Sequence, residues 1–341
     1  MEEKSGHKKD LRDFSSRELA GLVEELGHRP FRADQVMDWL YGKRVSRVEE
    51  MTNLPAGLVR SLAEYGLFLP DEKERLTSED GTVKFAFELV DGEVIESVLI
   101  PEEDRSTLCI SSQAGCRMGC RLCRTGQAGF RRQLTPSEIV GQVMSVEASG
   151  FAVNNIVIMG MGEPLDNLDA VLAALDVFFH GRGLKLSPSR VTLSTIGPLK
   201  KLDEFAKHGV PCNLAVSLHS AVHETRARLV PASPDPYKLK DALKRLSLPS
   251  RSRLTVEMVL MGGVNDSREE ARALVRWCDG LRVKVNLIPF NPFSKSGFDA
   301  PSPEATAAYQ SFLRDKGITA LVRKSRGSDI QAACGQLARN C

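Results

Sequence analysis

The sequence lacks any long apolar run. Although 42% of its 341 residues are hydrophobic, no stretch approaches the roughly 18 consecutive apolar residues that a membrane-spanning helix needs. The first ten residues also lack the apolar core and the small-residue cleavage site of a secretory signal. We therefore expect a cytoplasmic protein with no membrane partner.

A strong excess of charge is missing as well. The chain carries 46 basic and 44 acidic residues, for a formal net charge of +2. Bulk charge therefore does not indicate a nucleic-acid partner, and any such interpretation rests on local clusters of basic residues. The eight cysteines are spread over a long chain. Because the cytosol keeps thiols reduced, we expect metal binding or catalysis from them rather than stable disulfides.

The first third of the sequence changes character twice. Short pieces of helical apolar spacing between residues 12 and 67 predict a small helical domain, which we assign to residues 1–80. Two alternating runs around a short polar turn then predict a β-hairpin linker over residues 81–104. Basic residues in the helical domain face either RNA or solvent: Arg29, Arg32, Lys43, Arg44 and Arg47.

Residues 105–341 alternate between strand-like apolar runs and helical stretches. Such alternation predicts an α/β domain in which helices cover a parallel sheet, as a full or a partial barrel. In that architecture functional residues lie at the carboxyl ends of the strands. The predicted strands cover residues 107–111, 155–159, 191–195, 213–218, 254–260, 283–288 and 319–323.

A C-x3-C-x2-C motif, formed by Cys116, Cys120 and Cys123, follows the first of these strands. Three thiolates at this spacing can ligate three irons of one [4Fe-4S] cubane and leave the fourth iron open. The amino and carboxylate groups of S-adenosylmethionine (SAM) can chelate an open iron, which places the sulfonium beside the cluster. The motif therefore predicts reductive cleavage of SAM. A zinc site is the alternative. Such a site ordinarily takes four protein ligands, often from two C-x2-C-like cysteine pairs, and the sequence has no second pair of this kind.

Beyond this motif, the chain resembles the radical SAM enzymes and, more narrowly, the RlmN family of adenine-C2 RNA methyltransferases. The resemblance implies a partial (βα)6 radical SAM barrel preceded by a small helical domain and a connecting β-hairpin. It also implies methylation of carbon 2 of an adenosine in 23S rRNA and of an adenosine next to the tRNA anticodon. The segments that carry it are Pro101–Arg105, Met159–Leu165, Ser217–His219, Asn286–Pro292 and Ala332–Leu337.

The resemblance assigns roles to individual residues. Carbon 2 of adenine is too electron-poor to attack a sulfonium methyl group, and the family solves this with two SAM molecules and a methyl-cysteine intermediate. Here Cys334 would carry the methyl group, Cys109 would attack the Cys334 sulfur and leave a disulfide, and Glu96 would accept the C2 proton. The resemblance places SAM contacts at Gly162, Glu163, Ser194, Ser217, Leu218, His219 and Asn291.

The expected partners are RNA and an electron donor such as flavodoxin or ferredoxin, and we expect a monomer. Basic residues gather around the cysteine motif and before Cys334, which favours phosphate contacts there over scattered surface charge. Around the motif these residues are Arg117, Arg121, Arg124, Arg131 and Arg132, and before Cys334 they are Arg323, Lys324 and Arg326.

Three positions depart from the family pattern. Leu122 stands where an aromatic residue is usual, Arg124 where a small residue is usual, and Ser328 where an acid is common. They leave the RNA target open. Two other functions also stay open: adenine-C8 methylation of 23S rRNA by the antibiotic-resistance branch, and zinc-dependent RNA binding without catalysis. Pro164, in Gly-Glu-Pro, favours the C2 branch.

Overall fold

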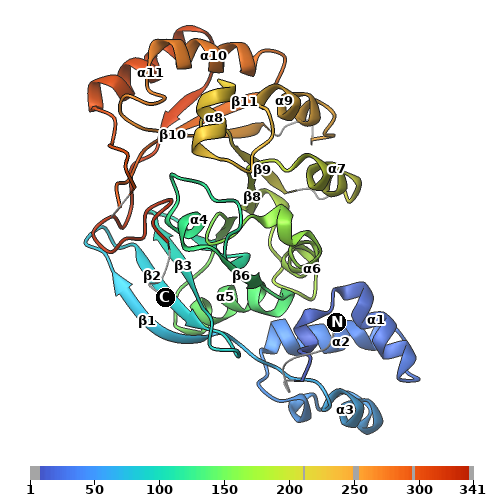
Figure 1. Ribbon diagram of the computed structural model, residues 1–341. Coiled ribbons are helices and arrows are strands. Elements are labelled where there is room, and N and C mark those ends of the chain that lie inside the picture. Colours follow the sequence, from blue (N-terminus) through green and yellow to red (C-terminus); the bar gives the residue numbers. More distant parts are fainter. Residues whose placement is uncertain (1–7, 210–211, 249–252, 294–295, 338–341) are drawn as a thin grey trace.

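The computed structural model describes residues 8–209, 212–248, 253–293 and 296–337. Its centre is a sheet of ten strands in the order β1-β2-β3-β4-β7-β8-β9-β10-β11-β12 (Figure 1). Within this described sheet, β1 and β12 are the two edges and do not pair with each other. The sheet is therefore an open, partial barrel.

The parallel part of the sheet contains all seven predicted strands. Each strand from β4 to β12 in the sheet order pairs in parallel with the next. The predicted α/β fold class, with its partial barrel, is confirmed. The strands are β4 (Ser106–Ile110), β7 (Asn155–Ile158), β8 (Val191–Thr195), β9 (Asn213–Ser217), β10 (Leu254–Leu260), β11 (Val283–Pro289) and β12 (Ala320–Val322).

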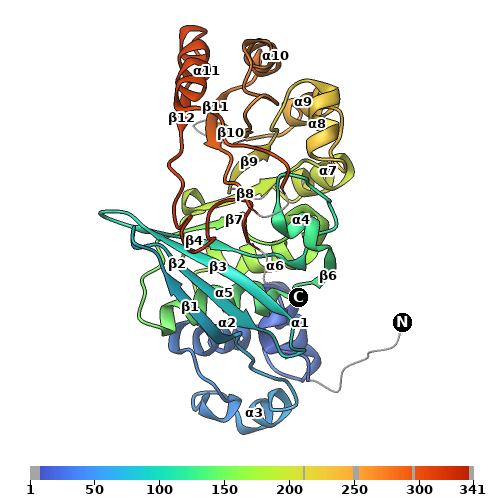
Figure 2. The ribbon, with the colours of Figure 1, turned by 60° about the vertical axis from the view of Figure 1, so that its left-hand side comes forward.

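Helices cover the outer face of this sheet, as Figures 1 and 2 show. The first long helix begins at a capping box, in which the Thr135 hydroxyl accepts from the backbone of Glu138 and the Glu138 carboxylate accepts from the backbone of Thr135. The helices of this layer are α5 (Pro136–Ala148), α6 (Leu168–Phe179), α7 (Leu199–Lys207), α8 (His223–Leu229), α9 (Pro236–Lys244), α10 (Arg268–Cys278) and α11 (Pro303–Asp315).

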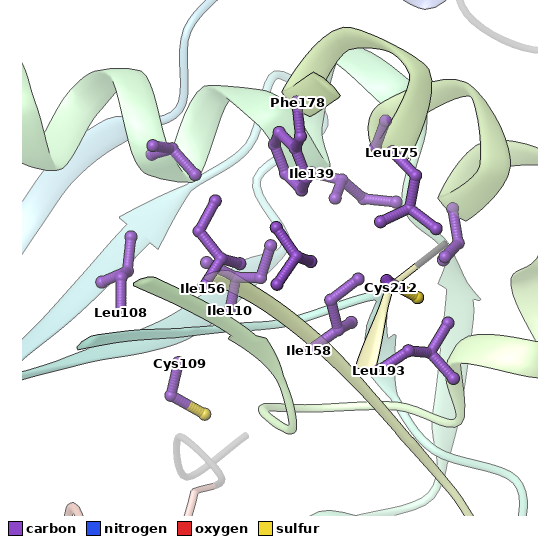
Figure 3. Close-up of a cluster of buried hydrophobic side chains, with 14 of the residues drawn as sticks. Leu108, Cys109, Ile110, Ile139, Ile156, Ile158, Leu175, Phe178, Leu193 and Cys212 are labelled. Atoms are coloured by element: carbon purple, nitrogen blue, oxygen red, sulfur yellow. The ribbon is translucent and has the colours of Figure 1, made fainter. Parts of the chain in front are cut away.

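Strand β4 shows how the sheet separates its core from its functional face. Leu108 and Ile110 are fully buried and pack towards α5 and α6, near Ile139 and Phe178. Cys109 lies between them in the sequence and therefore points to the opposite face, as Figure 3 shows. The alternation of one strand thus places a thiol on the inner side of the barrel.

Three antiparallel strands extend the sheet beyond β4. Strands β2 (Val83–Glu88) and β3 (Val94–Pro101) form the predicted hairpin, and β3 pairs with β4. Strand β1 (Asp71–Thr77) precedes them and was not predicted. All seven of its residues are exposed, so its sequence has no alternation of apolar and polar residues from which a strand could be recognised.

A small helical unit precedes the sheet and packs on α5 and α6 (Figure 2). The Ser16 amide donates to the Asp176 carboxylate at 2.7 Å, and the Ser137 amide donates to Asp13 at 3.1 Å. The domain boundaries at residues 80 and 104 stay predictions. The main elements of this unit are α1 (Ser16–Glu25), α2 (Phe31–Met37) and α3 (Ala56–Leu62), with shorter helical turns at Leu11–Asp13, Asp38–Lys43 and Val48–Glu50.

After β12 the chain returns across the inner side of the molecule as a C-terminal segment, residues 323–337. The Ser78 hydroxyl donates to Asp329 at 2.6 Å, and the Arg124 amide donates to the Gly335 carbonyl at 2.7 Å. These bonds tie the segment to the β1–β2 turn and to the loop that carries the cysteine motif. None of the described helices combines the length and the apolar character needed to cross a bilayer.

Candidate active site

Two adjoining cavities open at the inner side of the sheet. The strand-end cavity, of about 150 Å³, lies at the carboxyl ends of the parallel strands. The segment cavity, of about 310 Å³, lies between the sheet and the C-terminal segment. Residues of both cavities form a common wall, which includes Cys123, Met159, Ile288, Arg323 and Cys334.

The three motif cysteines all line the strand-end cavity. Cys116 follows the short strand β5 (Gln113–Gly115), and Cys123 is the N-cap residue of α4 (Arg124–Ala128). Gly115 makes the tight turn before the motif: its φ is +79°, and a Cβ there would lie 2.1 Å from the Gly129 carbonyl oxygen. The fold therefore brings together the three thiols that the sequence predicted as cluster ligands.

The Gly-Glu pair after β7 borders the same cavity. Gly162 has φ +109°, and a Cβ there would lie 2.7 Å from the Ser112 hydroxyl, so only glycine leaves this space open. The buried Glu163 carboxylate accepts from the Thr195 hydroxyl at 2.6 Å and from the Ile196 amide at 3.0 Å. Burial raises the pKa of Glu163 to about 7. Glu163 thus holds the ends of β7 and β8 together at the cavity.

Three further predicted SAM contacts lie in the strand-end cavity. The hydroxyls of Ser194 and Ser217 are 3.3 Å apart. The ring Nδ1 of His219 accepts from the Val259 amide at 3.2 Å, and burial lowers the pKa of His219 to about 3. The imidazole is therefore neutral at physiological pH and carries its proton on Nε2.

Two predicted SAM contacts lie elsewhere. Leu218 is fully buried and belongs to the main hydrophobic core, so its side chain does not line either cavity. Asn291 lines the segment cavity instead, where its side-chain oxygen accepts from the Ser325 hydroxyl. The structure therefore brings five of the seven residues together.

The segment cavity contains the other two predicted thiols, Cys109 and Cys334. Burial raises the pKa of Cys109 to about 12. Cys334 is exposed to the cavity, while the surrounding protein raises the pKa of its thiol and the charge of Arg323 opposes that rise. Both thiols are free in this structure. Apolar walls face them, and basic residues surround them, namely Arg323, Lys324 and Arg326.

Glu96 does not line either cavity. It is buried on β3, where its carboxylate lies 3.4 Å from the ammonium group of Lys84. Val98, two residues further along the same face of β3, does line the segment cavity. Lys84 also donates to the Gln331 carbonyl at 3.4 Å. Glu96 therefore lies on β3 next to Val98, which forms the cavity wall, but does not itself reach the cavity. Lys84 links Glu96 to the C-terminal segment.

Two of the three residues that depart from the family pattern contact residues of the site. Leu122 packs in a small apolar cluster with Ile196 and Ile288 and lines the strand-end cavity. The Arg124 guanidinium donates to the side-chain oxygen of Gln331, so this arginine ties the cysteine loop to the C-terminal segment. Ser328 is exposed, and nothing in the structure explains its replacement of an acid.

Two of the five arginines near the motif are held in ion pairs within the chain. Arg117 lies 2.9 Å from the Asp166 carboxylate and stacks over Phe130, and Arg132 pairs with Asp91 and Glu138. Their charges are therefore already partly neutralised. In the C-terminal segment, Arg326 lies 3.9 Å from the Asp80 carboxylate, and Arg323 and Lys324 line the segment cavity.

Sequence reasoning missed two buried charged residues at the site. Arg226 donates to the Ser217 carbonyl at 2.9 Å and to the Ile196 carbonyl at 2.8 Å, and so supports the turns after β8 and β9. Glu257 lines the strand-end cavity from the middle of β10. The available signal for Glu257 was an acid in the middle of a mostly apolar strand.

The donor set of the strand-end cavity fits an iron–sulfur cubane. A cubane binds each cysteine on a different iron, so its ligands surround a volume and do not meet at one point. Three thiols line one cavity, and Gly162 has no side chain to fill the space beside them, which matches that requirement. Among the residues with described positions, no three His, Cys, Asp or Glu side chains are grouped as a site for a single metal ion.

Comparison with known families agrees with this geometry. Residues 9–66 match the ribosomal RNA large subunit methyltransferase N-terminal domain, and residues 110–275 match the radical SAM superfamily. The chain is 46% identical over 335 residues to the dual-specificity RNA methyltransferase RlmN of Syntrophotalea carbinolica, with 96% of this chain and 89% of that protein covered. The protein of the same name from Geobacter sulfurreducens is 45% identical over 332 residues, with 96% and 91% covered.

The chain belongs to the RlmN family of radical SAM enzymes. A crystal structure of a radical SAM methyltransferase from Sphaerobacter thermophilus matches the fold with a TM-score of 0.86 and 38% identity, over 96% of this chain and 98% of that one. The resemblance drawn from the motifs is confirmed. Membership of the RlmN family implies a [4Fe-4S] cluster and SAM as cofactors, and it does not favour the zinc-binding or C8 alternatives.

Proposed function

We propose that this chain is a radical SAM methyltransferase that methylates carbon 2 of an adenosine in 23S rRNA and of an adenosine next to the tRNA anticodon. The observation that carries the proposal is the position of Cys334 in the wall common to both cavities. A thiol in that position can receive a group from one cavity and deliver it in the other. The dual-specificity name of the RlmN relatives supports the choice of substrates.

The strand-end cavity is the proposed cofactor site. Cys116, Cys120 and Cys123 would hold the cluster, which when bound supplies the electron for reductive cleavage of SAM. Gly162 leaves room for close approach, and the side chains on the strand ends offer both donors and acceptors. We assign the SAM contacts in this cavity to Gly162, Glu163, Ser194, Ser217 and His219.

The segment cavity is the proposed site of the adenine. Val98, Ile100 and Ile288 give it apolar walls that suit a base taken out of its stack. Arg323, Lys324 and Arg326 provide cations for the adjoining phosphates. An adenine between these walls would lie next to Cys334.

The two thiols of the segment cavity have separate proposed roles. Cys334 carries the methyl group, and the carbon of that group becomes bonded to carbon 2 of the adenine, so RNA and protein are joined. Cys109, on the sheet side of the same cavity, then attacks the Cys334 sulfur: an S–S bond forms while the bond from that sulfur to the carried carbon breaks, and the released carbon takes up a proton as the methyl group of the product. An external thiol reductant reduces the Cys109–Cys334 disulfide before the next turnover. Glu96 is the proposed acceptor of the C2 proton. It lies on the same face of β3 as Val98 and Ile100, with Lys84 beside it.

Further proposals concern the surroundings of the enzyme. A small one-electron carrier such as flavodoxin or ferredoxin would supply the reducing electron. We propose that the chain acts as a monomer in the cytoplasm, where rRNA and tRNA are available to it.

Analysis of modified nucleosides tests the proposed function. After anaerobic turnover with the reconstituted enzyme, digested 23S rRNA and tRNA should both contain 2-methyladenosine by mass spectrometry. Detection of 8-methyladenosine alone would assign the chain to the C8 branch. A protein that takes up zinc but no iron or sulfide, and leaves both RNAs unmodified, would support the non-catalytic alternative.

A further inference from the structure

Strand β10 contains a buried acid that the roles above do not use. All seven residues of β10, Leu254–Leu260, are buried, and Glu257 at its centre has only 4% of its surface exposed. Burying a carboxylate costs free energy unless its oxygens accept hydrogen bonds. The neighbours of each oxygen therefore indicate what this acid is for.

The position of Glu257 is fixed from both sides of its strand. Glu257 is in register with Ser217 on β9 and with Asn286 on β11. Its side-chain Oε1 accepts from the Asn286 amide group at 3.0 Å. Its backbone carbonyl accepts from the amides of Leu218 at 3.0 Å and His219 at 3.3 Å. Glu257 thus supports the turn after β9 through its backbone, while its side chain is held by Asn286 and lines the strand-end cavity.

The second carboxylate oxygen, Oε2, has a different environment. It is buried and has no hydrogen-bond partner among the residues that the structure describes. Glu257 lines the strand-end cavity, together with Ser217 and His219, and does not line the segment cavity. Arg323 lines the same cavity and its charge acts on this carboxylate, yet it makes no hydrogen bond to Oε2. The missing donor is therefore expected from a molecule that occupies the strand-end cavity, and not from an adenine in the segment cavity.

We propose that Glu257 accepts hydrogen bonds from the ribose hydroxyls of SAM through Oε2. This inference rests on the proposed function, because it assigns SAM to the strand-end cavity. SAM offers an α-ammonium, a pair of vicinal ribose hydroxyls and an adenine amino group as donors. A buried acid that accepts from ribose hydroxyls is a recurrent solution in nucleotide sites.

The sheet geometry separates Glu257 from the other carboxylate of the cavity. Glu163 follows β7, whereas Glu257 lies on β10, three strands further along the sheet. The Glu163 carboxylate is held at the end of β8 by Thr195 and Ile196, two strands from β10. Neighbouring strands are about 4.8 Å apart, so the two carboxylates are on the order of 10 Å apart along the sheet. Two acids at this spacing contact different parts of one extended cofactor. We assign the α-ammonium to Glu163 and the ribose hydroxyls to Glu257, since both acids line the strand-end cavity.

A cycle that combines protein and ligand changes tests the inference. The ligands are S-adenosylhomocysteine and its 2′,3′-dideoxy analogue, titrated calorimetrically into the anaerobic, cluster-loaded full chain. In the wild type, loss of the hydroxyls should weaken binding about 10- to 100-fold, as expected for hydrogen bonds to a charged acceptor. In Glu257→Gln, S-adenosylhomocysteine should bind that much more weakly, and loss of the hydroxyls should have little further effect.

Glu270→Gln is the matched control. Glu270 is also a buried acid, but it accepts from the Ser220 hydroxyl and does not line either cavity. This variant should keep the wild-type sensitivity to the hydroxyls. If Glu257→Gln lowers the iron content of the protein, Glu257→Asp is used as the test variant instead. The shorter aspartate keeps the negative charge but places its oxygen too far from the ribose hydroxyls to accept from them. Glu257→Asp should then show the same insensitivity to the hydroxyls.

Two results would overturn the inference and can be told apart. If removal of the hydroxyls weakens binding equally in the wild type and in the Glu257 variant, Glu257 contacts another part of the ligand or only water, and the proposed function stands. If the cluster-loaded wild type binds neither ligand, the assignment of SAM to this cavity fails, and the proposed function fails with it.

Discussion

The strand-end cavity and the segment cavity share a wall but are built in different ways. The strand-end cavity is formed mainly by the ends of consecutive parallel strands, and its polar groups, such as Glu163 and His219, are buried and held by hydrogen bonds within the chain. The segment cavity combines β3, β4 and β11 with the C-terminal segment, and exposed cations surround it. Polar groups fixed by hydrogen bonds within the chain suit a small cofactor of constant shape, whereas exposed cations suit a large polyanion.

The largest effect should come from the thiol that lies only in the segment cavity. Cys109→Ala should lower product formation at least about 100-fold, because the enzyme could no longer release RNA from Cys334. RNA joined to the protein should persist on denaturing gels under reducing conditions. Cys212→Ala is the control, since Cys212 is a buried core thiol that lines neither cavity. Normal turnover by Cys109→Ala would contradict the proposal that Cys109 releases the product from Cys334.

Smaller effects on ligand affinity should distinguish a cation that lines only the segment cavity from one that lines both cavities. Lys324 lines only the segment cavity, so Lys324→Ala should weaken RNA binding about 5- to 10-fold and reduce the salt dependence by about one phosphate contact. Binding of S-adenosylhomocysteine should not change. Arg323 lines both cavities, and Arg323→Ala should weaken both ligands. Filter binding and calorimetry measure the two affinities, with Lys316→Ala, at the exposed residue that follows α11, as the control.

The smallest effect on activity is expected at Asp10, which lies outside both cavities. Asp10 accepts from the amides of Arg12 and Phe68, and burial raises its pKa from 3.8 to about 6. The folded state therefore binds this proton more tightly than the unfolded chain does. The stabilisation is complete below about pH 4 and is lost as the pH rises through 6, by about 3 kcal/mol.

Asp10→Asn should flatten that loss in denaturant unfolding measured between pH 4 and pH 7, while both ligand affinities stay unchanged. The exposed Asp34→Asn in α2 should keep the wild-type slope. A change in SAM or RNA affinity in the Asp10 variant would show that the helical unit and the cavities are coupled.

The sequence predicted the strand-end cavity better than the segment cavity, for a physical reason. Parallel strands are buried apolar runs, and residues at or just after their ends meet at one edge of the sheet. The strand pattern therefore placed Gly162 and Ser217 at that edge, and the family resemblance assigned them to SAM. The segment cavity depends on contacts between residues about 200 or more positions apart, such as Arg124 with Gln331 and Ser78 with Asp329. No local pattern encodes these pairs.

Individual departures follow the same division. Leu218 alternates away from the cavity because neighbouring residues of an extended chain face opposite sides, although it lies between two residues that line the cavity. Strand β1 was missed because charged, exposed residues carry no apolar period. Glu257 was missed because its role depends on the cavity that its strand borders, which the strand sequence does not reveal.

The central claim is that Cys334, in the wall between the cavities, carries the methyl group from one to the other. Anaerobic incubation with SAM bearing a deuterated methyl group, followed by peptide and nucleoside mass spectrometry, tests it directly. The label should appear on Cys334 before RNA is added and on carbon 2 of adenosine afterwards, and Cys334→Ala should label neither. Labelled RNA from the Cys334→Ala enzyme, or a label on Cys109 in its place, would contradict the account.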